Sequence, residues 1–273
     1  MPSKAGRNLP AAIGVGAVLG GLILGTLLWN PWAWIVLYTS SLLIGVWELA
    51  RAFGQGRVRI PLVPCLLATA VMGPAALVGG PGALLLVLGA SLILLVLWRS
   101  ARGLDGAARD VSAGAFVIGY GPFLAAFTTL MVATPGDGAL RVITFVLVTV
   151  FSDIGGYAVG VLAGKHPMAP SVSPKKSWEG FAGSILACVL TGSISLPILL
   201  GGSPWAGALF GVVMVLLGTL GDLVESMIKR DLGVKDLGTI LPGHGGLMDR
   251  VDSLLVAAPV AWLLLLLMVP PPA

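Results

Sequence analysis

Hydrophobic residues along the chain gather into long runs that are separated by short segments rich in glycine, proline and charge. A helix that crosses a hydrocarbon core about 30 Å thick needs roughly 20 consecutive, mostly apolar residues. Such runs recur nine times, at residues 11–28, 32–50, 62–80, 82–98, 111–133, 139–164, 181–200, 205–224 and 251–269. The pattern predicts an all-α, polytopic membrane bundle of about nine transmembrane helices without a separate soluble domain.

The third and fourth runs are the least clearly separated, because only residues 79–82, with the sequence Gly-Gly-Pro-Gly, stand between them. Glycine and proline at that density indicate a turn, whereas merging the two runs would leave eight spans. The first run follows Lys4 and Arg7 in the manner of a signal peptide. No A-x-A-like cleavage site follows it, so we expect it to remain a helix of the mature protein.

Composition and charge placement support this topology. The chain is 57% apolar and 10% charged, whereas about a quarter of the residues of a soluble domain are charged. With nine spans, fifteen of the 16 Lys and Arg residues fall on one side and only Arg141 falls on the other. The positive-inside rule then places the N-terminus in the cytoplasm. We expect an integral protein of a bacterial inner or plasma membrane, with its chemistry at the cytoplasmic face.

The chain divides into two predicted regions. Residues 1–140 form N-terminal transmembrane helices that provide lipid access or dimer contacts, and residues 141–273 carry cytoplasmic catalytic loops at 165–180 and 225–250. The arginines of the first region satisfy the positive-inside rule, and we interpret them as topogenic. They are Arg51, Arg57, Arg59, Arg99 and Arg102.

The most polar stretch of the chain runs over residues 221–253. If the eighth helix continues past the membrane surface, the i, i+3, i+4, i+7 spacing places four polar residues on one face. They are Asp222, Glu225, Ser226 and Lys229. Asp249 and Asp252 begin the ninth helix, so carboxylates of two helices meet at one aqueous boundary. Carboxylates beside cations suit Mg²⁺ that is bound by one or two acids and by substrate phosphates. Alternatively, either aspartate only caps the helix and the nearby glycines form a turn.

The loop at residues 165–180 carries lysines and hydroxyls, which can bind phosphate oxygens. Alternatively, its lysines only satisfy the positive-inside rule and Glu179 only precedes a helix. Asp153 lies deep in the sixth run, where an ionisable residue indicates function by default, although it could instead pair with a neighbouring helix. Glu48 lies near the inner end of the second run and could pair with Arg51.

The stretch from Ser226 to Asp252 resembles the signature of the phosphatidate cytidylyltransferases, also called CDP-diacylglycerol synthases. The pattern S-x-x-K-R, four residues, K-D, then H-G-G-x-x-D-R-x-D is matched at every fixed position. The matching residues are Ser226, Lys229, Arg230, Lys235, Asp236, His244, Gly245, Gly246, Asp249, Arg250 and Asp252. Residues 152–157, 164–165 and 173–180 also resemble the family. The resemblance covers roughly the C-terminal half, and the first 140 residues match only as a series of apolar helices.

The resemblance implies transfer of CMP from CTP to phosphatidic acid, giving CDP-diacylglycerol and pyrophosphate, with Mg²⁺ as cofactor and a second metal ion left open. The implied metal ligands are Asp222 and Asp249, with Asp153 and Asp252 as supporting acids. The implied catalytic residues are Asp222, Asp249, Lys229, Arg230, His244 and Arg250. The implied substrate-binding residues are Lys165, Ser173, Lys175, Lys176, Glu179, Ser226, Lys235, Gly245 and Gly246.

The expected partners are CTP, phosphatidic acid, the lipid bilayer and a second copy of the chain. Family resemblance favours a homodimer, and the glycine-rich residues 14–25 permit the close helix packing that a dimer needs. The same small residues could equally pack within one chain. No nucleic acid is expected.

Three other functions compete with this interpretation. Residues 105–109 resemble the D-G-x-x-A-R motif of CDP-alcohol phosphotransferases, but the spacing is one residue short and the later aspartates are absent. A CTP-dependent lipid kinase would release CDP in place of pyrophosphate. A transporter is disfavoured because transport sites usually lie near the membrane midplane, where Asp153 is the only candidate.

Overall fold

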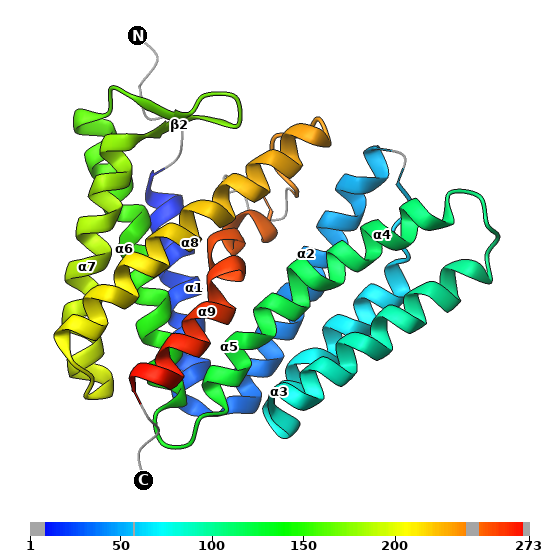
Figure 1. Ribbon diagram of the computed structural model, residues 1–273, viewed down its shortest axis with the longest axis horizontal. Helices are drawn as coiled ribbons and strands as arrows, with labels where there is room; N and C mark the ends of the chain where they lie inside the picture. The colour runs from blue at the N-terminus through cyan, green and yellow to red at the C-terminus, as the bar shows by residue number, and fades with distance from the viewer. Residues whose placement is uncertain (1–8, 57, 239–245, 270–273) are drawn as a thin grey trace.

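The computed structural model describes residues 9–56, 58–238 and 246–269, and these residues form a bundle of helices (Figure 1). The helices are α1 (Leu9–Trp29), α2 (Pro31–Gln55), α3 (Leu62–Ser100), α4 (Ala107–Ile118), α5 (Leu124–Val132), α6 (Gly138–Ala163), α7 (Trp178–Leu200), α8 (Pro204–Asp231) and α9 (Asp252–Met268). A π-helical turn, η1 (Gly119–Phe123), joins α4 to α5, and a 3₁₀ turn, η2 (Met248–Arg250), precedes α9.

Each of the nine predicted runs falls on helical structure. By length and composition, six described helical segments can cross a membrane, with α4, η1 and α5 counted as one segment and α3 as another. The α3 segment contains a break at Gly80, whose φ of 64° is a left-handed conformation that favours glycine. The chain reverses there (Figure 1, cyan), so the predicted turn at residues 79–82 is confirmed. The count of nine spans and the cytoplasmic N-terminus stay predictions.

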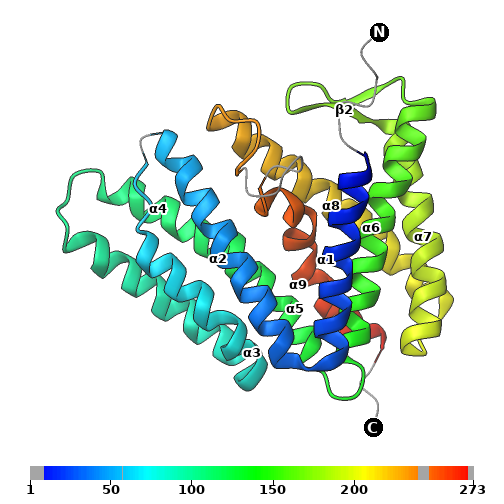
Figure 2. The ribbon, with the colours of Figure 1, turned by 180° about the vertical axis from the view of Figure 1, so that it is seen from behind.

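The two ends of the bundle differ in the connections they carry. The β1–β2 hairpin, the end of α8 and the end of α2 lie toward the upper end in Figures 1 and 2. The turns α1–α2, α5–α6 and α7–α8 and the break in α3 lie toward the lower end. The upper end, called here the loop-bearing end, is therefore the side to which the charge pattern assigns the long polar segments.

The segment at residues 165–180 is more ordered than a proline-fixed loop. Strand β1 (Pro167–Ala169) pairs antiparallel with β2 (Ser173–Ser177), and this hairpin leads directly into α7. The Ser177 side chain accepts a hydrogen bond from the Gly180 backbone N–H, which caps α7. The helical class predicted from the sequence is therefore observed, and the described part of the chain adds one small hairpin.

Helices α6, α7 and α8 pack closely because small residues face one another. A Cβ atom on Gly207 of α8 would overlap the backbone carbonyl of Gly192 on α7. A Cβ atom on Gly155 of α6 would overlap Ala187 and the Gly183 backbone on the facing side of α7. Small residues at such crossings allow helix backbones in membranes to approach closely. This packing brings polar groups of α6 and α8 to one site.

Arg141, the lone cation predicted on the far side, is buried and has a structural role. Its guanidinium forms an ion pair with Asp137, with Nε 2.7 Å from Oδ1. It also donates hydrogen bonds to the backbone carbonyls of Leu265 (2.9 Å) and Val269 (2.7 Å). Carbonyls at a helix C-terminus have no partner within the helix, so Arg141 caps α9 and connects it to the start of α6. Its charge is balanced locally.

Candidate active site

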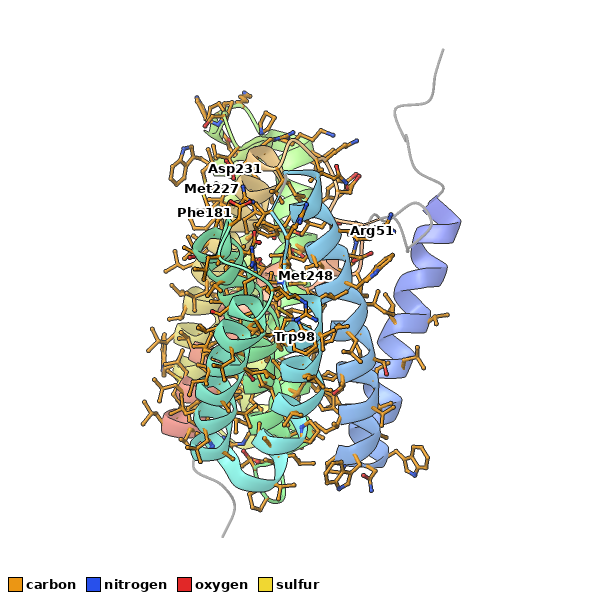
Figure 3. The ribbon with its side chains drawn as sticks, turned by 90° about the vertical axis from the view of Figure 1, so that its right-hand side faces the viewer. Arg51, Trp98, Phe181, Met227, Asp231 and Met248 are labelled. Carbon is orange, nitrogen blue, oxygen red and sulfur yellow. The ribbon has the colours of Figure 1, made fainter. Side chains whose placement is uncertain are left out.

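A polar cavity of about 210 Å³ lies where α6, α7, α8 and β2 meet near the loop-bearing end. Asp153 reaches it from α6, Lys175 and Lys176 from β2, and Asp222 from α8. Phe181 of α7 forms part of its wall and is labelled in Figure 3. Four residues that were predicted from separate segments therefore line one space, called here the Asp222 cavity.

Charge in the Asp222 cavity is organised around one ion pair. The Lys176 ammonium contacts the Asp222 carboxylate, and the two side chains are 27% and 28% exposed. The carboxylates of Asp153 and Asp252 also interact electrostatically with Asp222. Lysines on a strand beside carboxylates on two helices give a site that can bind both phosphate groups and a divalent cation.

A second group of charged residues lies where the end of α8 meets η2. Lys229 Nζ lies 3.0 Å from Glu225 Oε2 and 2.9 Å from Asp249 Oδ1. The Asp249 carboxylate also accepts hydrogen bonds from the backbone N–H groups of Leu237 (3.0 Å) and Gly246 (2.8 Å). Its side chain is only 4% exposed. This group, called here the Asp249 network, fixes the turn before α9 against α8.

The Asp249 network sets the ionisation of its own carboxyl group. Burial alone would raise the pKa of Asp249, but the hydrogen bonds from Lys229 and from the Gly246 N–H outweigh burial. The pKa of Asp249 therefore lies below its ordinary value. Asp249 is an anion at neutral pH.

This lowered pKa predicts an acid-dependent loss of stability. A carboxyl group with a lower pKa in the folded state stabilises the fold above its unfolded pKa of about 3.9, and the contribution is lost as pH falls through the folded pKa. The stability difference between the wild type and Asp249→Asn should be constant above about pH 5 and shrink below about pH 4. Thermal unfolding between about pH 3 and pH 7 measures it. A difference that grows toward acid pH would contradict the assignment.

The turn before α9 is also bound by a residue from the N-terminal half of the chain. Buried Glu48 of α2 accepts hydrogen bonds through Oε2 from the backbone N–H groups of Leu247 (2.8 Å) and Met248 (3.3 Å). Figure 3 labels Met248 of η2, which is fully buried, and Arg51, which is exposed near the end of α2, the helix that carries Glu48. Glu48 is thus a positioning residue for the segment that carries Asp249.

We expect Glu48→Ala to lower kcat by about 10- to 100-fold, as removal of supporting hydrogen bonds around a site commonly does. It leaves two buried backbone N–H groups without this acceptor, which costs about 2 kcal/mol of stability. Glu48→Gln retains an acceptor oxygen and should recover most of both losses. Initial rates and melting temperatures of the two variants test this, and a wild-type rate for Glu48→Ala would contradict it.

Several predicted site residues lie outside the Asp222 cavity. Glu179 lies at the base of the hairpin, where it pairs with the His166 ring and accepts hydrogen bonds from the backbone N–H groups of Lys165 (3.1 Å) and His166 (3.2 Å). The other described predicted residues absent from the cavity lining are Lys165, Ser173, Ser226, Lys229, Arg230, Lys235, Gly246, Asp249, Arg250 and Asp252. Of these, Lys229, Gly246 and Asp249 form the Asp249 network. His244 and Gly245 lie outside the described residues.

Three polar residues at this site were not selected by the sequence analysis. Glu225 was noted only as part of a helix face, yet its Oε2 binds Lys229. For Glu48 the sequence leaves a pairing with Arg51 open, and the structure shows it bound to the turn before α9. Buried Tyr120 of η1 interacts electrostatically with Glu225 and Asp252. The sequence signal for these residues was their polarity within apolar helices, because polar residues in such helices usually face the bundle interior. The structure adds that Tyr120 lies in a π-helical turn, a feature that often marks a functional site.

The residues present fit a Mg²⁺ ion that is completed by a substrate. Among the described residues, no group of three or more Asp, Glu, His or Cys side chains could hold a metal ion. Mg²⁺ commonly uses one or two carboxylates together with water and substrate phosphates. Asp153 and Asp222 share one cavity and match that donor set. The Asp249 oxygens already accept several hydrogen bonds, and Asp252 Oδ1 accepts one from the Ser253 N–H. A metal role for Asp249 and Asp252 stays a prediction.

Comparison with known proteins identifies the family. The model of the Cytidylyltransferase family matches residues 10–268. A phosphatidate cytidylyltransferase of Mycobacterium leprae is 43% identical over 285 aligned positions, which cover 97% of this chain and 90% of the relative. The chain belongs to the phosphatidate cytidylyltransferase family. Phosphatidate cytidylyltransferases of Mycobacterium bovis (41% identical, 97% of this chain and 91% of the relative) and Brucella suis (31%, 90% and 91%) are also similar.

Membership in the phosphatidate cytidylyltransferase family confirms the resemblance that was based on residues 152–252, and it shows that the chain is a nucleotidyltransferase. The matched region also includes the N-terminal helices, which carry no motif of the family by the residue patterns described above. The family implies CTP-dependent synthesis of CDP-diacylglycerol, with CTP and phosphatidate as substrates. The apolar helices and the bacterial relatives support an integral membrane protein.

Proposed function

We propose that this chain catalyses Mg²⁺-dependent transfer of CMP from CTP to phosphatidic acid at the cytoplasmic face of the membrane. The observation that carries the proposal is the meeting of Asp153 and Asp222 with Lys175 and Lys176 in one cavity near the loop-bearing end. A reaction between a nucleoside triphosphate and a lipid phosphate brings four phosphate groups together. Such a site needs cations to offset the negative charge and carboxylates to bind a metal ion.

The reaction forms one phosphorus–oxygen bond and breaks another. An oxygen of the lipid phosphate attacks the α-phosphorus of CTP, the bond between the α-phosphorus and the bridging oxygen to the β-phosphorus breaks, and pyrophosphate leaves. Lys175 and Lys176 bind phosphate oxygens in this scheme. The Asp249 network holds the turn before α9 so that Arg250 and Asp252 lie beside the cavity, where Arg250 interacts electrostatically with Asp153.

Mg²⁺, when bound, neutralises phosphate charge and polarises the α-phosphorus. Asp222 is the proposed principal ligand, with Asp153 beside it and with Asp249 and Asp252 as the further acids that the family resemblance implies. Lys176, which contacts Asp222 directly, then has phosphate oxygens as alternative partners. A second metal ion is compatible with this number of carboxylates.

A homodimer with a cytoplasmic active site is part of the same proposal. Gly20, Gly21 and Gly25 of α1 have open space where a Cβ atom would lie. Close packing through these glycines is therefore available to a second copy of the chain. The cytoplasmic orientation is supported by the positive-inside count and by the need for CTP at the loop-bearing end.

The test is pyrophosphate release by the purified protein in mixed micelles of detergent and phosphatidic acid, with CTP and with or without Mg²⁺. Release that requires both substrates and the metal is the expected result. Release of CDP in place of pyrophosphate would identify a lipid kinase. Folded protein that releases neither product would refute the proposal, and substrate flux into liposomes that is lost on Asp153→Asn would then indicate transport.

A further inference from the structure

A second polar cleft, of about 850 Å³, lies between α2, the segment after it, α3 and the start of α4. Figures 1 and 2 place α4 and α6–α7 on opposite sides of the bundle, so this cleft is separate from the Asp222 cavity. Four arginines and two aspartates line it, together with Trp47 and apolar residues. The charged residues are Arg51, Arg59, Arg99, Arg109, Asp105 and Asp110. We call it the arginine cleft.

The floor of the arginine cleft is a buried ion pair. Asp110 is 1% exposed, and its Oδ2 lies 2.9 Å from Arg99 Nε. Its Oδ1 accepts a hydrogen bond from the Arg59 backbone N–H at 3.1 Å. Arg99 also donates hydrogen bonds to the backbone carbonyls of Gly103 and Asp105. These contacts fix the loop at residues 101–106 and the start of α4 against the end of α3. The cleft is thus built by specific contacts.

The cationic side chains above this floor remain available to a ligand. Arg51, Arg59 and Arg109 are exposed. Among the described residues, no ion pair joins the guanidinium of Arg51 or Arg59 to a carboxylate. Arg109 Nε lies 3.5 Å from Asp110 Oδ1, which also accepts the shorter hydrogen bond from the Arg59 backbone N–H. The cleft therefore has a net positive charge that the described chain does not neutralise.

Two further features of the arginine cleft match an anion at a membrane surface. Helix α4 starts at the cleft, and no side chain caps its first backbone N–H groups, so these donors face the cleft beside the arginines, while Asp110 in the first turn offsets part of the helix dipole. The Arg51 guanidinium stacks over the Trp47 ring at 4.6 Å from the centroid. Tryptophan is enriched at membrane–water interfaces, and arginine binds phosphate oxygens through its planar fork of donors.

We propose that the arginine cleft binds an anionic phosphate headgroup, with a membrane lipid as its source. The arginine cleft lies at the ends of the apolar helices α2 and α3, which brings its arginines to the level of the lipid headgroups. Basic residues at that level attract anionic lipids. Topology alone requires positive charge on this side of the membrane, but it requires neither a cleft nor a buried ion pair beneath the arginines. This site is additional to the catalytic one and does not depend on the reaction proposed above.

The test compares lipid binding by the full-length, detergent-purified wild type with that of the triple variant Arg51→Gln/Arg59→Gln/Arg109→Gln. Phosphatidylglycerol is the probe because its phosphodiester lacks the free phosphate that the proposed reaction uses, and phosphatidylcholine is the neutral comparison. CTP is left out. Native mass spectrometry gives the apparent Kd of each lipid, and inorganic phosphate serves as a competitor that represents a soluble source.

We expect the triple variant to bind phosphatidylglycerol about 100-fold more weakly than the wild type, because three cations beside an anionic headgroup are lost. Arg59→Gln alone should weaken binding about fivefold. The matched control Arg102→Gln should have no effect, because Arg102 is exposed in the same region but lies outside the cleft lining, stacked 4.0 Å from the Trp98 centroid. Arg59→Gln leaves the buried ion pair intact, so it remains informative if the triple variant folds poorly.

Displacement of phosphatidylglycerol by inorganic phosphate at similar concentration would overturn the lipid source, because the cleft would then take a soluble phosphate equally well. Binding that resists phosphate would support the lipid source. Equal affinity of the wild type and both cleft variants would overturn the proposal. Equal affinity of the wild type for phosphatidylglycerol and phosphatidylcholine would also overturn it, because the cleft would then not select negative charge.

Discussion

Asp222→Asn is expected to lower kcat by about 1000-fold while the melting temperature of the protein changes little. The neutral amide keeps the shape of the side chain but removes the negative charge that binds Mg²⁺ and pairs with Lys176. Charge stabilisation of this kind commonly contributes 100- to 1000-fold in rate (about 3 to 4 kcal/mol). Both side chains of the pair are more than a quarter exposed, so solvent screens their contribution to stability. Pyrophosphate release and thermal unfolding measure the two effects.

Asp231→Asn is the matched control for this prediction. Asp231 is the last residue of the same helix, is exposed, and is absent from the lining of the Asp222 cavity. The control should retain the wild-type rate. If Asp222→Asn retains the wild-type rate and the wild-type Mg²⁺ dependence, the cavity is not the reaction site. If its activity loss is accompanied by a large fall in melting temperature, the residue has a structural role instead.

Asp249→Asn is expected to remove activity and also to destabilise the protein. Asp249 accepts hydrogen bonds from Lys229 and from two backbone N–H groups, and its side chain is almost fully buried. An asparagine has only one acceptor oxygen, so its amide N–H₂ faces another donor. Breaking a buried charge pair costs about 3 kcal/mol, which corresponds to a fall in melting temperature of about 5 to 10 °C in a chain of this size.

The comparison of Asp249→Asn with Asp222→Asn separates a metal ligand from a positioning acid. Substitution of a residue that only binds Mg²⁺ would lower the activity of the protein but not its stability, and the activity would recover in part at high Mg²⁺ concentration. Substitution of a positioning acid would lower both activity and stability, and added Mg²⁺ would restore neither of them. Full stability of Asp249→Asn would show that the hydrogen bonds around Asp249 contribute less than their geometry indicates, and the metal assignment would then gain support.

The lengths of the apolar runs in the sequence predicted most of the helices of the fold. Nearly every turn between helices follows from glycine, proline or charge at the boundary, and the break at Gly80 was visible because three glycines and one proline stand together. The hairpin over β1 and β2 was missed, since a two-stranded pairing of short polar segments has no hydrophobic alternation to mark it. The role of Arg141 was missed because its partners Leu265 and Val269 are backbone carbonyls far along the chain.

The chemistry of the site was also partly determined by the sequence. The spacing of the motifs identified the family, the polar segments, and the acids and lysines of the Asp222 cavity. It did not separate Asp222, which lines a cavity, from Asp249, which is buried in a network. The two residues have the same side chain, and their difference arises from neighbours on other helices. Sequence spacing specifies faces of one helix but not the partners that a neighbouring helix supplies.

The sequence by itself therefore determined the membrane class, the approximate positions of the apolar runs, the family and the set of ionisable residues near one end of the bundle. The tertiary structure alone decided which of these residues meet, that Glu48 of α2 binds the turn before α9, and that arginines expected only to set topology surround a cleft. The physical reason is that buried polar groups are satisfied by whichever donor or acceptor is near in space. Contacts between residues 48 and 247, or 59 and 110, exist only after the helices have packed.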